Sequence, residues 1–199
     1  MSAAIAIKPA VSSSSLRTPK NRTLTFEGFL KKYSSVEDGY KYEWNNGVVE
    51  KYPKMLTKEQ LHILRNLNRF FSTTESYTNG GEFVQEFVTM TTETQMRLPD
   101  ICYLSAKDNL DCDRGAYVIT PFAIEVVSTN DKVNELNAKT REYFNAGVKV
   151  VWHIFPEIEM VAVYTAPLAV KLCEGETLCS AETVIPGFII QAQNIFRKL

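Results

Sequence analysis

Phe122-Ala-Ile-Glu-Val-Val127 is a nearly continuous apolar run, the pattern of a strand buried on both faces at the centre of a sheet. Residues 131–146 follow with helical spacing, and Gly147 is a natural helix stop. A second apolar run covers 148–155. Strand, helix and strand joined this closely form a βαβ unit, so this stretch predicts two neighbouring parallel strands with a helix packed across them.

The sequence around this unit alternates strand and helix signals, which predicts an α/β or α+β fold with a mixed sheet and flanking helices. The predicted elements are a helix over 26–34 capped by Thr25, a hairpin from Tyr40 to Tyr52 turning at Asn46-Gly47, a helix over 57–72 capped by Thr57, strands over 83–91 and 97–104, a loop over 105–119, strands over 159–165 and near 169–173, and a helix near 191–197.

Two of the predicted helices have an apolar stripe that we expect to face the core. In the helix over 57–72, the stripe is Leu61, Leu64, Leu67, Phe70 and Phe71. In the helix over 131–146, the stripe is Val133, Leu136, Thr140, Tyr143 and Phe144.

Length and composition limit the possible classes. The 199 residues suit one domain, which we place at 23–199 after a disordered tail over 1–22. No run approaches 18 apolar residues, so we expect no membrane association. The net charge is −1, and −5 without residues 1–26, so bulk charge does not mark a nucleic-acid binder. Four cysteines without zinc-ligand spacing fit a reducing cytoplasm.

Glu125 stands inside the most apolar strand of the sequence. A buried carboxylate costs several kcal/mol unless a cation, a metal or a proton compensates it. Asp100 opens another apolar strand after Pro99. Each has a plainer interpretation, as a strand-end cap for Glu125 and as a turn residue for Asp100. Together they place two carboxylates at the margins of two neighbouring strands, an arrangement that Mg²⁺ and Mn²⁺ favour.

Two further residues are candidates for the same site. Lys139 borders the apolar stripe of its helix, so it either reaches the sheet carboxylates or forms a surface pair with Glu135. A lysine near a metal orients or activates a water nucleophile. Glu43 alternates to the opposite strand face from Tyr42 and Trp44, which makes it a site acid or a solvent-facing residue. We expect His62 and His153 to be structural. Phosphate-cradle, serine-hydrolase and zincin motifs are absent from the sequence.

These residues also occur in a recognisable order. The chain resembles the PD-(D/E)xK nuclease superfamily, and more closely the bacterial Uma family of restriction-endonuclease-like proteins (domain of unknown function 820). The resemblance covers about residues 23–197. Its motifs are Tyr42-Glu-Trp-Asn-Asn-Gly47, Leu98-Pro-Asp-Ile101, Phe122-Ala-Ile-Glu-Val-Val-Ser128, the helix end from Lys139 to Val148, and Val151-Trp-His-Ile-Phe-Pro156.

The resemblance implies a restriction-endonuclease-like mixed central sheet with flanking helices and an N-terminal hairpin. It also implies a metal site of Asp100 and Glu125, with Glu43 as an additional acid. The superfamily's usual lysine, two residues after the glutamate, is replaced here by Val127. In the Uma family this lysine is thought to have moved to the following helix, which corresponds to Lys139.

The sequence therefore predicts an endonuclease that hydrolyses DNA phosphodiester bonds with bound Mg²⁺ or Mn²⁺. Asp100, Glu125, Lys139 and Glu43 are the predicted catalytic residues, and the three acids are the predicted metal ligands. DNA is the expected partner, and a homodimer would suit paired cuts. Two alternatives stay open, a catalytically silent binding or assembly module and a nuclease acting on RNA or branched DNA.

Overall fold

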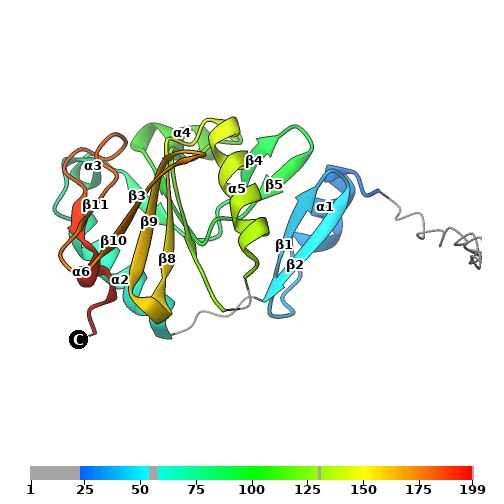
Figure 1. Cartoon of the computed structure of the whole chain (residues 1–199). Helices are drawn as coiled ribbons and strands as arrows, with labels where there is room; N and C mark the ends of the chain where they lie inside the picture. Colours follow the sequence, from blue (N-terminus) through cyan, green and yellow to red (C-terminus); the bar gives the residue numbers. More distant parts are fainter. Residues whose placement is uncertain (1–22, 54–57, 130, 199) are drawn as a thin grey trace, which may run out of the picture.

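A computed structural model describes residues 23–53, 58–129 and 131–198. The predicted βαβ unit forms the centre of the molecule (Figure 1). Strands β7 (Phe122–Val126) and β8 (Val150–Phe155) pair in parallel, and α5 (Val133–Ala146) connects them. Gly147 ends α5 in the left-handed conformation at φ 114°, and its N–H donates to the carbonyls of Tyr143 and Phe144.

The βαβ unit belongs to a six-stranded sheet with the order β10-β9-β8-β7-β6-β3. The other neighbouring pairs in this sheet are antiparallel, so the sheet is mixed. Its remaining strands are β3 (Glu82–Val84), β6 (Ile101–Leu104), β9 (Met160–Ala166) and β10 (Ala169–Glu174).

A second, four-stranded sheet contains the predicted N-terminal hairpin and has the order β2-β1-β5-β4. The hairpin turns at Asn46 and Gly47, both with positive φ (49° and 83°), which is the geometry of the tight turn that Asn-Gly favours. The strands are β1 (Tyr40–Asn45), β2 (Val48–Pro53), β4 (Thr89–Thr92) and β5 (Gln95–Arg97). Helix α5 packs against β4, so it lies between the two sheets (Figure 1).

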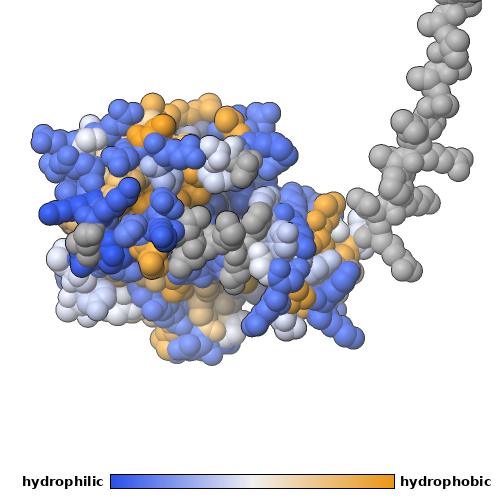
Figure 2. Space-filling view, turned by 90° about the horizontal axis from the view of Figure 1, so that it is seen from below, coloured by the Kyte–Doolittle hydropathy of each residue, from blue (hydrophilic) through white to orange (hydrophobic). Residues whose placement is uncertain are grey.

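Both faces of the central sheet are covered, which explains why its strands are apolar throughout. One face packs on the main core, where Trp152 stacks on Phe188 and contacts Phe122. The other face packs on α5 through Tyr143. Figure 2 shows the polar surface outside, with scattered apolar patches. The remaining elements are α1 (Phe26–Tyr33), α2 (Lys58–Phe71), α3 (Glu75–Thr78), α4 (Ala106–Asp113), a 3₁₀ turn (Pro156–Ile158), the β11–β12 pair (Leu178–Ser180, Ile189–Gln191) and α6 (Ala192–Phe196).

The structure corrects several predicted elements. The predicted loop over 105–119 contains helix α4, which begins with a capping box between Ser105 and Asp108. The predicted strand over 83–91 is interrupted at Glu86, whose φ is 51°, and the strand over 97–104 is broken between β5 and β6. The β4–β5 and β11–β12 pairs were not predicted.

The two predicted apolar stripes also need correction. Leu61, Phe70 and Val133 are exposed, because Ile63 and Asn66 face inward in α2 and Lys139 takes an inward position in α5. The predicted tail over 1–22 and the cap at Thr57 lie outside the described residues.

Candidate active site

Asp100 and Glu125 lie side by side where β6 pairs with β7. Ile101 of β6 pairs with Ile124 of β7, so Asp100, immediately before β6, lies beside Glu125. Its Oδ2 atom accepts a hydrogen bond from the backbone N–H of Val126 at 2.8 Å. The two carboxylates are near enough that the negative charge of Asp100 contributes to raising the pKa of Glu125. The predicted pair of neighbouring carboxylates therefore forms.

Glu125 is almost fully buried, with 5% of its surface exposed. Burial raises the pKa of Glu125, and the positive charge of Lys139 opposes that effect. Its Oε1 atom accepts a hydrogen bond from the Tyr143 hydroxyl at 2.6 Å and lies 3.9 Å from Lys139 Nζ. Among the residues that the structure describes, none donates a hydrogen bond to Oε2, so this atom is available to a ligand.

Lys139 extends from α5 toward these carboxylates. Its Nζ donates to Glu43 Oε1 at 3.2 Å and lies 4.6 Å from the centre of the Tyr52 ring. Burial lowers the pKa of Lys139, but the charges of Glu125 and Glu43 outweigh burial and the net pKa is raised. The lysine is therefore charged. Glu135 pairs with Lys132 rather than with Lys139, which settles the choice between the two sequence-based interpretations.

Glu43 is completely buried and accepts three hydrogen bonds. Besides Lys139, the donors are Arg97 Nη1 at 2.8 Å and the backbone N–H of Leu98 at 3.0 Å. Arg97 continues the network, because its Nε donates to Glu142 at 2.7 Å and its Nη1 also to Glu50. Both oxygens of Glu43 therefore already have partners.

Lys41 is a site residue that the sequence-based prediction missed. Its Nζ donates to Asp100 Oδ1 at 2.6 Å and to the carbonyl of Leu98 at 3.2 Å. Burial lowers the pKa of Lys41, but the charges of Asp100, Glu125 and Glu43 outweigh it and the net pKa is raised. Strand alternation carried a signal for it, because Lys41 and Glu43 are two residues apart and share a face of β1. Arg97, Tyr143, Glu50 and Glu142 were missed as well.

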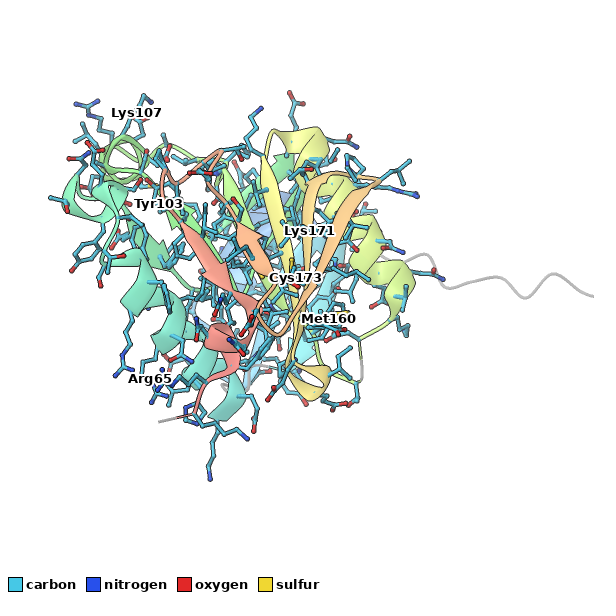
Figure 3. The ribbon with its side chains drawn as sticks, turned by 60° about the vertical axis from the view of Figure 1, so that its left-hand side comes forward. Arg65, Tyr103, Lys107, Met160, Lys171 and Cys173 are labelled. Atoms are coloured by element: carbon cyan, nitrogen blue, oxygen red, sulfur yellow. The ribbon has the colours of Figure 1, made fainter. Side chains whose placement is uncertain are left out.

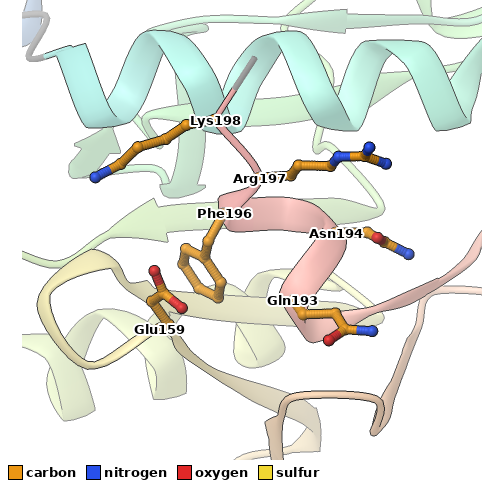
Figure 4. Close-up of a pocket in the computed structure, with 6 residues that line it drawn as sticks. All are labelled: Glu159, Gln193, Asn194, Phe196, Arg197 and Lys198. Atoms are coloured by element: carbon orange, nitrogen blue, oxygen red, sulfur yellow. The ribbon is translucent and has the colours of Figure 1, made fainter.

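The network borders a cleft of about 440 Å³. Lys139 and Arg97 form part of its wall, and the exposed Lys51 and Lys132 stand at its rim. The aromatic ring of Tyr52 lines the same cleft. A second cleft, also about 440 Å³, lies beside α6 (Figure 4) and contains none of the predicted site residues. Of the predicted site residues, Lys139 lines the first cleft, whereas Asp100, Glu125 and Glu43 are not among its lining residues.

The carboxylates of the network decide whether a divalent ion fits this site. Within the described ranges, no three His, Cys, Asp or Glu side chains gather in a metal-ligating group. Two carboxylates are present, Asp100 and Glu125, and one or two carboxylates completed by water and phosphate oxygens is the usual protein site of Mg²⁺. The residues therefore fit a two-carboxylate site. Glu43 accepts three hydrogen bonds, so it keeps about one lone-pair position for an ion, fewer than Asp100 or Glu125.

The histidines and cysteines lie outside this network. His153 is buried against Thr140, and burial, with Lys139 adding, lowers the pKa of His153 to about 4. His62 contacts Arg65 on α2. All four cysteines are unpaired, and Cys173 lies buried on β10, with Lys171 on the same strand (Figure 3). They offer no alternative site.

A solved structure with the same fold shows the class of fold to which this chain belongs. The fold is similar to a crystal structure described as "a putative nuclease belonging to DUF820", from Anabaena variabilis. The TM-score is 0.72 at 17% identity, covering 87% of this chain and 97% of that one. The fold is therefore restriction-endonuclease-like, as the sequence predicted.

The family follows from the sequence. The model of the Uma2 family, described as "Putative restriction endonuclease", matches residues 26–193, and the chain belongs to this family. No curated protein matches the chain. No helix among the described residues has the length and apolar character needed to cross a membrane.

Proposed function

We propose that this protein is a Mg²⁺- or Mn²⁺-dependent endonuclease that hydrolyses DNA phosphodiester bonds. One observation carries the proposal: Asp100, immediately before β6, lies beside Glu125 of β7, and the charged Lys139 Nζ is 3.9 Å from Glu125. Membership of the Uma2 family and the similarity to a nuclease structure support it.

Each residue has a distinct role in this proposal. Asp100 and Glu125 hold the divalent ion, which supplies a Lewis acid for the phosphate and lowers the pKa of a bound water. Lys139 orients the attacking water or neutralises the phosphate. Glu43 fixes the Lys139 ammonium and adds an acid to the site. Tyr143 fixes the orientation of the Glu125 carboxylate.

Binding of DNA requires positive charge near the site to attract its phosphates. The chain without its first 26 residues is acidic, so attraction to phosphate must be local. A bound divalent ion supplies part of it. Lys51 and Lys132, exposed at the rim of the cleft that Lys139 lines, would contact the phosphate backbone of a strand bound there. A weak salt dependence of DNA binding would count against these contacts.

A panel of substrates tests the proposal. Supercoiled, linear, single-stranded and branched DNA, and RNA, are incubated with the protein in Mn²⁺ and in EDTA. We expect metal-dependent cutting of DNA and a loss of about 100-fold or more in Glu125→Gln. Glu135→Gln, an exposed acid at the same rim, is the matched control and is expected to keep full activity.

The same panel separates the alternatives. Cutting confined to RNA or branched DNA keeps the metal chemistry and changes the substrate. A silent module would cut nothing, and the metal would not raise its melting temperature, whereas a metal site gains stability from its ligand. The retained Asp100, Glu125 and Lys139 favour the enzyme.

Location and assembly belong to this proposal too. We place the protein in the cytoplasm, where its four unpaired cysteines stay reduced. A homodimer would suit paired cuts on the two strands of a duplex. Sedimentation velocity in the presence of duplex DNA tests the homodimer. A dimer would add the mass of two chains to the DNA, and a monomer the mass of one.

A further inference from the structure

Lys41 contacts Asp100, the carboxylate that a second metal ion would have to share with the first. In sites that use two ions, the ions lie about 3.5–4 Å apart, close enough for one carboxylate to contact both. Asp100 is the carboxylate available for sharing, and Lys41 Nζ lies 2.6 Å from its Oδ1 atom. The ammonium also donates to the Leu98 carbonyl, so it is held from two sides. With 10% of its side chain exposed, Lys41 is too enclosed to swing freely into water.

The hydrogen bonds to Asp100 limit the positions that are left for metal ions. Oδ1 accepts from Lys41 and Oδ2 accepts from the backbone N–H of Val126. A carboxylate offers about four lone-pair positions, so two remain for further ligands. On the other side of the site, Glu125 Oε2 receives no hydrogen bond from the described residues. One ion between Asp100 and Glu125 is accommodated without displacing Lys41, whereas a second on the Lys41 side is not.

The charges of the network give an independent reason. Lys41, Arg97 and Lys139 are its cations. Its carboxylates are Glu43, Glu50, Asp100, Glu125 and Glu142. When all are ionised, the network has an excess of two negative charges. One divalent ion neutralises that excess, whereas two would leave a positive excess inside a largely buried site, which is costly.

We infer that Lys41 is a fixed cation that takes the place of a second metal ion, so that the site binds one divalent ion per chain. This inference rests on the proposed function, because it concerns the same metal site. It assigns Lys41 as a positioning residue: its ammonium holds Asp100 in the orientation that receives the single ion.

Counting bound Mn²⁺ tests the inference. Free Mn²⁺ is measured by electron paramagnetic resonance during a titration of the full chain, and calorimetry gives the stoichiometry independently. We expect one ion per chain in the wild type and in Lys41→Arg, which keeps the charge. Lys41→Met and Lys41→Gln remove the charge and are expected to bind two. Lys107→Met, which removes an exposed lysine outside the network, should still bind one.

Circular dichroism melting of each metal-free variant shows that it is folded before its ions are counted. Two ions in the wild type, or one ion in both folded neutral variants, would overturn the inference and leave the proposed function standing. A wild type that binds no Mn²⁺ would overturn the proposed function, and the role of Lys41 with it.

Discussion

Replacing Arg97 with methionine should destabilise the protein strongly. The side chain is 4% exposed and forms ion pairs with three carboxylates. Glu43 is 0% exposed and would lose Arg97 while keeping Lys139 and the Leu98 N–H, so its share lies at the lower end of the about 3–5 kcal/mol that breaking a buried ion pair costs. Glu50 and Glu142 are 27% and 23% exposed, so water compensates them and each adds roughly 0–1 kcal/mol. We therefore expect a loss of about 3–5 kcal/mol.

Urea unfolding, followed by circular dichroism, measures this loss. Arg114→Met is the matched control, because Arg114 is 69% exposed with its carboxylate partner at 3.9 Å, and it should change stability by less than about 0.5 kcal/mol. The double variant Glu43→Gln, Arg97→Met should lose less unfolding free energy than the sum of the two single variants. Each substitution removes the charge that the other would leave without its ion-pair partner. A loss below about 1 kcal/mol in Arg97→Met would contradict the role of Arg97 as a partner of the buried Glu43 carboxylate.

Three further predictions concern stability and pH. The pKa of His153 is about 4 in the folded protein and 6.5 unfolded, so stability is fully present above pH 6.5 and falls by up to about 3 kcal/mol as the pH drops toward 4; urea titrations of His153→Gln should show this part of the pH dependence removed. Ser105→Ala removes the capping box of α4 and should cost about 1 kcal/mol of unfolding free energy, and an unchanged urea midpoint would contradict the cap. Gly47→Ala places a methyl group 2.8 Å from Thr23 Cβ at φ +83°, so the melting temperature should drop by several degrees, whereas Gly115→Ala, with open space at the same φ, should lose less.

The sequence predicted the centre of the fold well because local and global signals agree there. The apolar run of β7 requires cover on both faces, and Gly147 fixes the end of α5, so a parallel pair with a crossover helix follows from physical rules alone. Helix α4 was missed because it has little apolar periodicity, although Ser105 and Asp108 carry a capping signal. The strand is interrupted at Glu86, whose φ is positive. Residues other than glycine rarely adopt a positive φ, so no signal in the sequence indicated this interruption.

The sequence could indicate a site residue when the pattern of a single helix or strand determined which way its side chain faces. The phase of α5 put Lys139 beside the core stripe, and strand alternation put Glu43 opposite Trp44. The contact of Lys41 with Asp100 joins the two sheets, and no local pattern specifies how two sheets sit against each other. The same holds for Arg97, which connects β5 to α5 through Glu142.

Cleavage of supercoiled plasmid in Mn²⁺, comparing the wild type with Glu125→Gln and Lys139→Met, is the most direct test of metal-dependent DNA hydrolysis by this site. We predict nicking and linearisation by the wild type, abolished by EDTA and reduced about 100-fold or more in both variants. Cutting by the wild type that persists in EDTA, or that either folded variant retains at full rate, would contradict it.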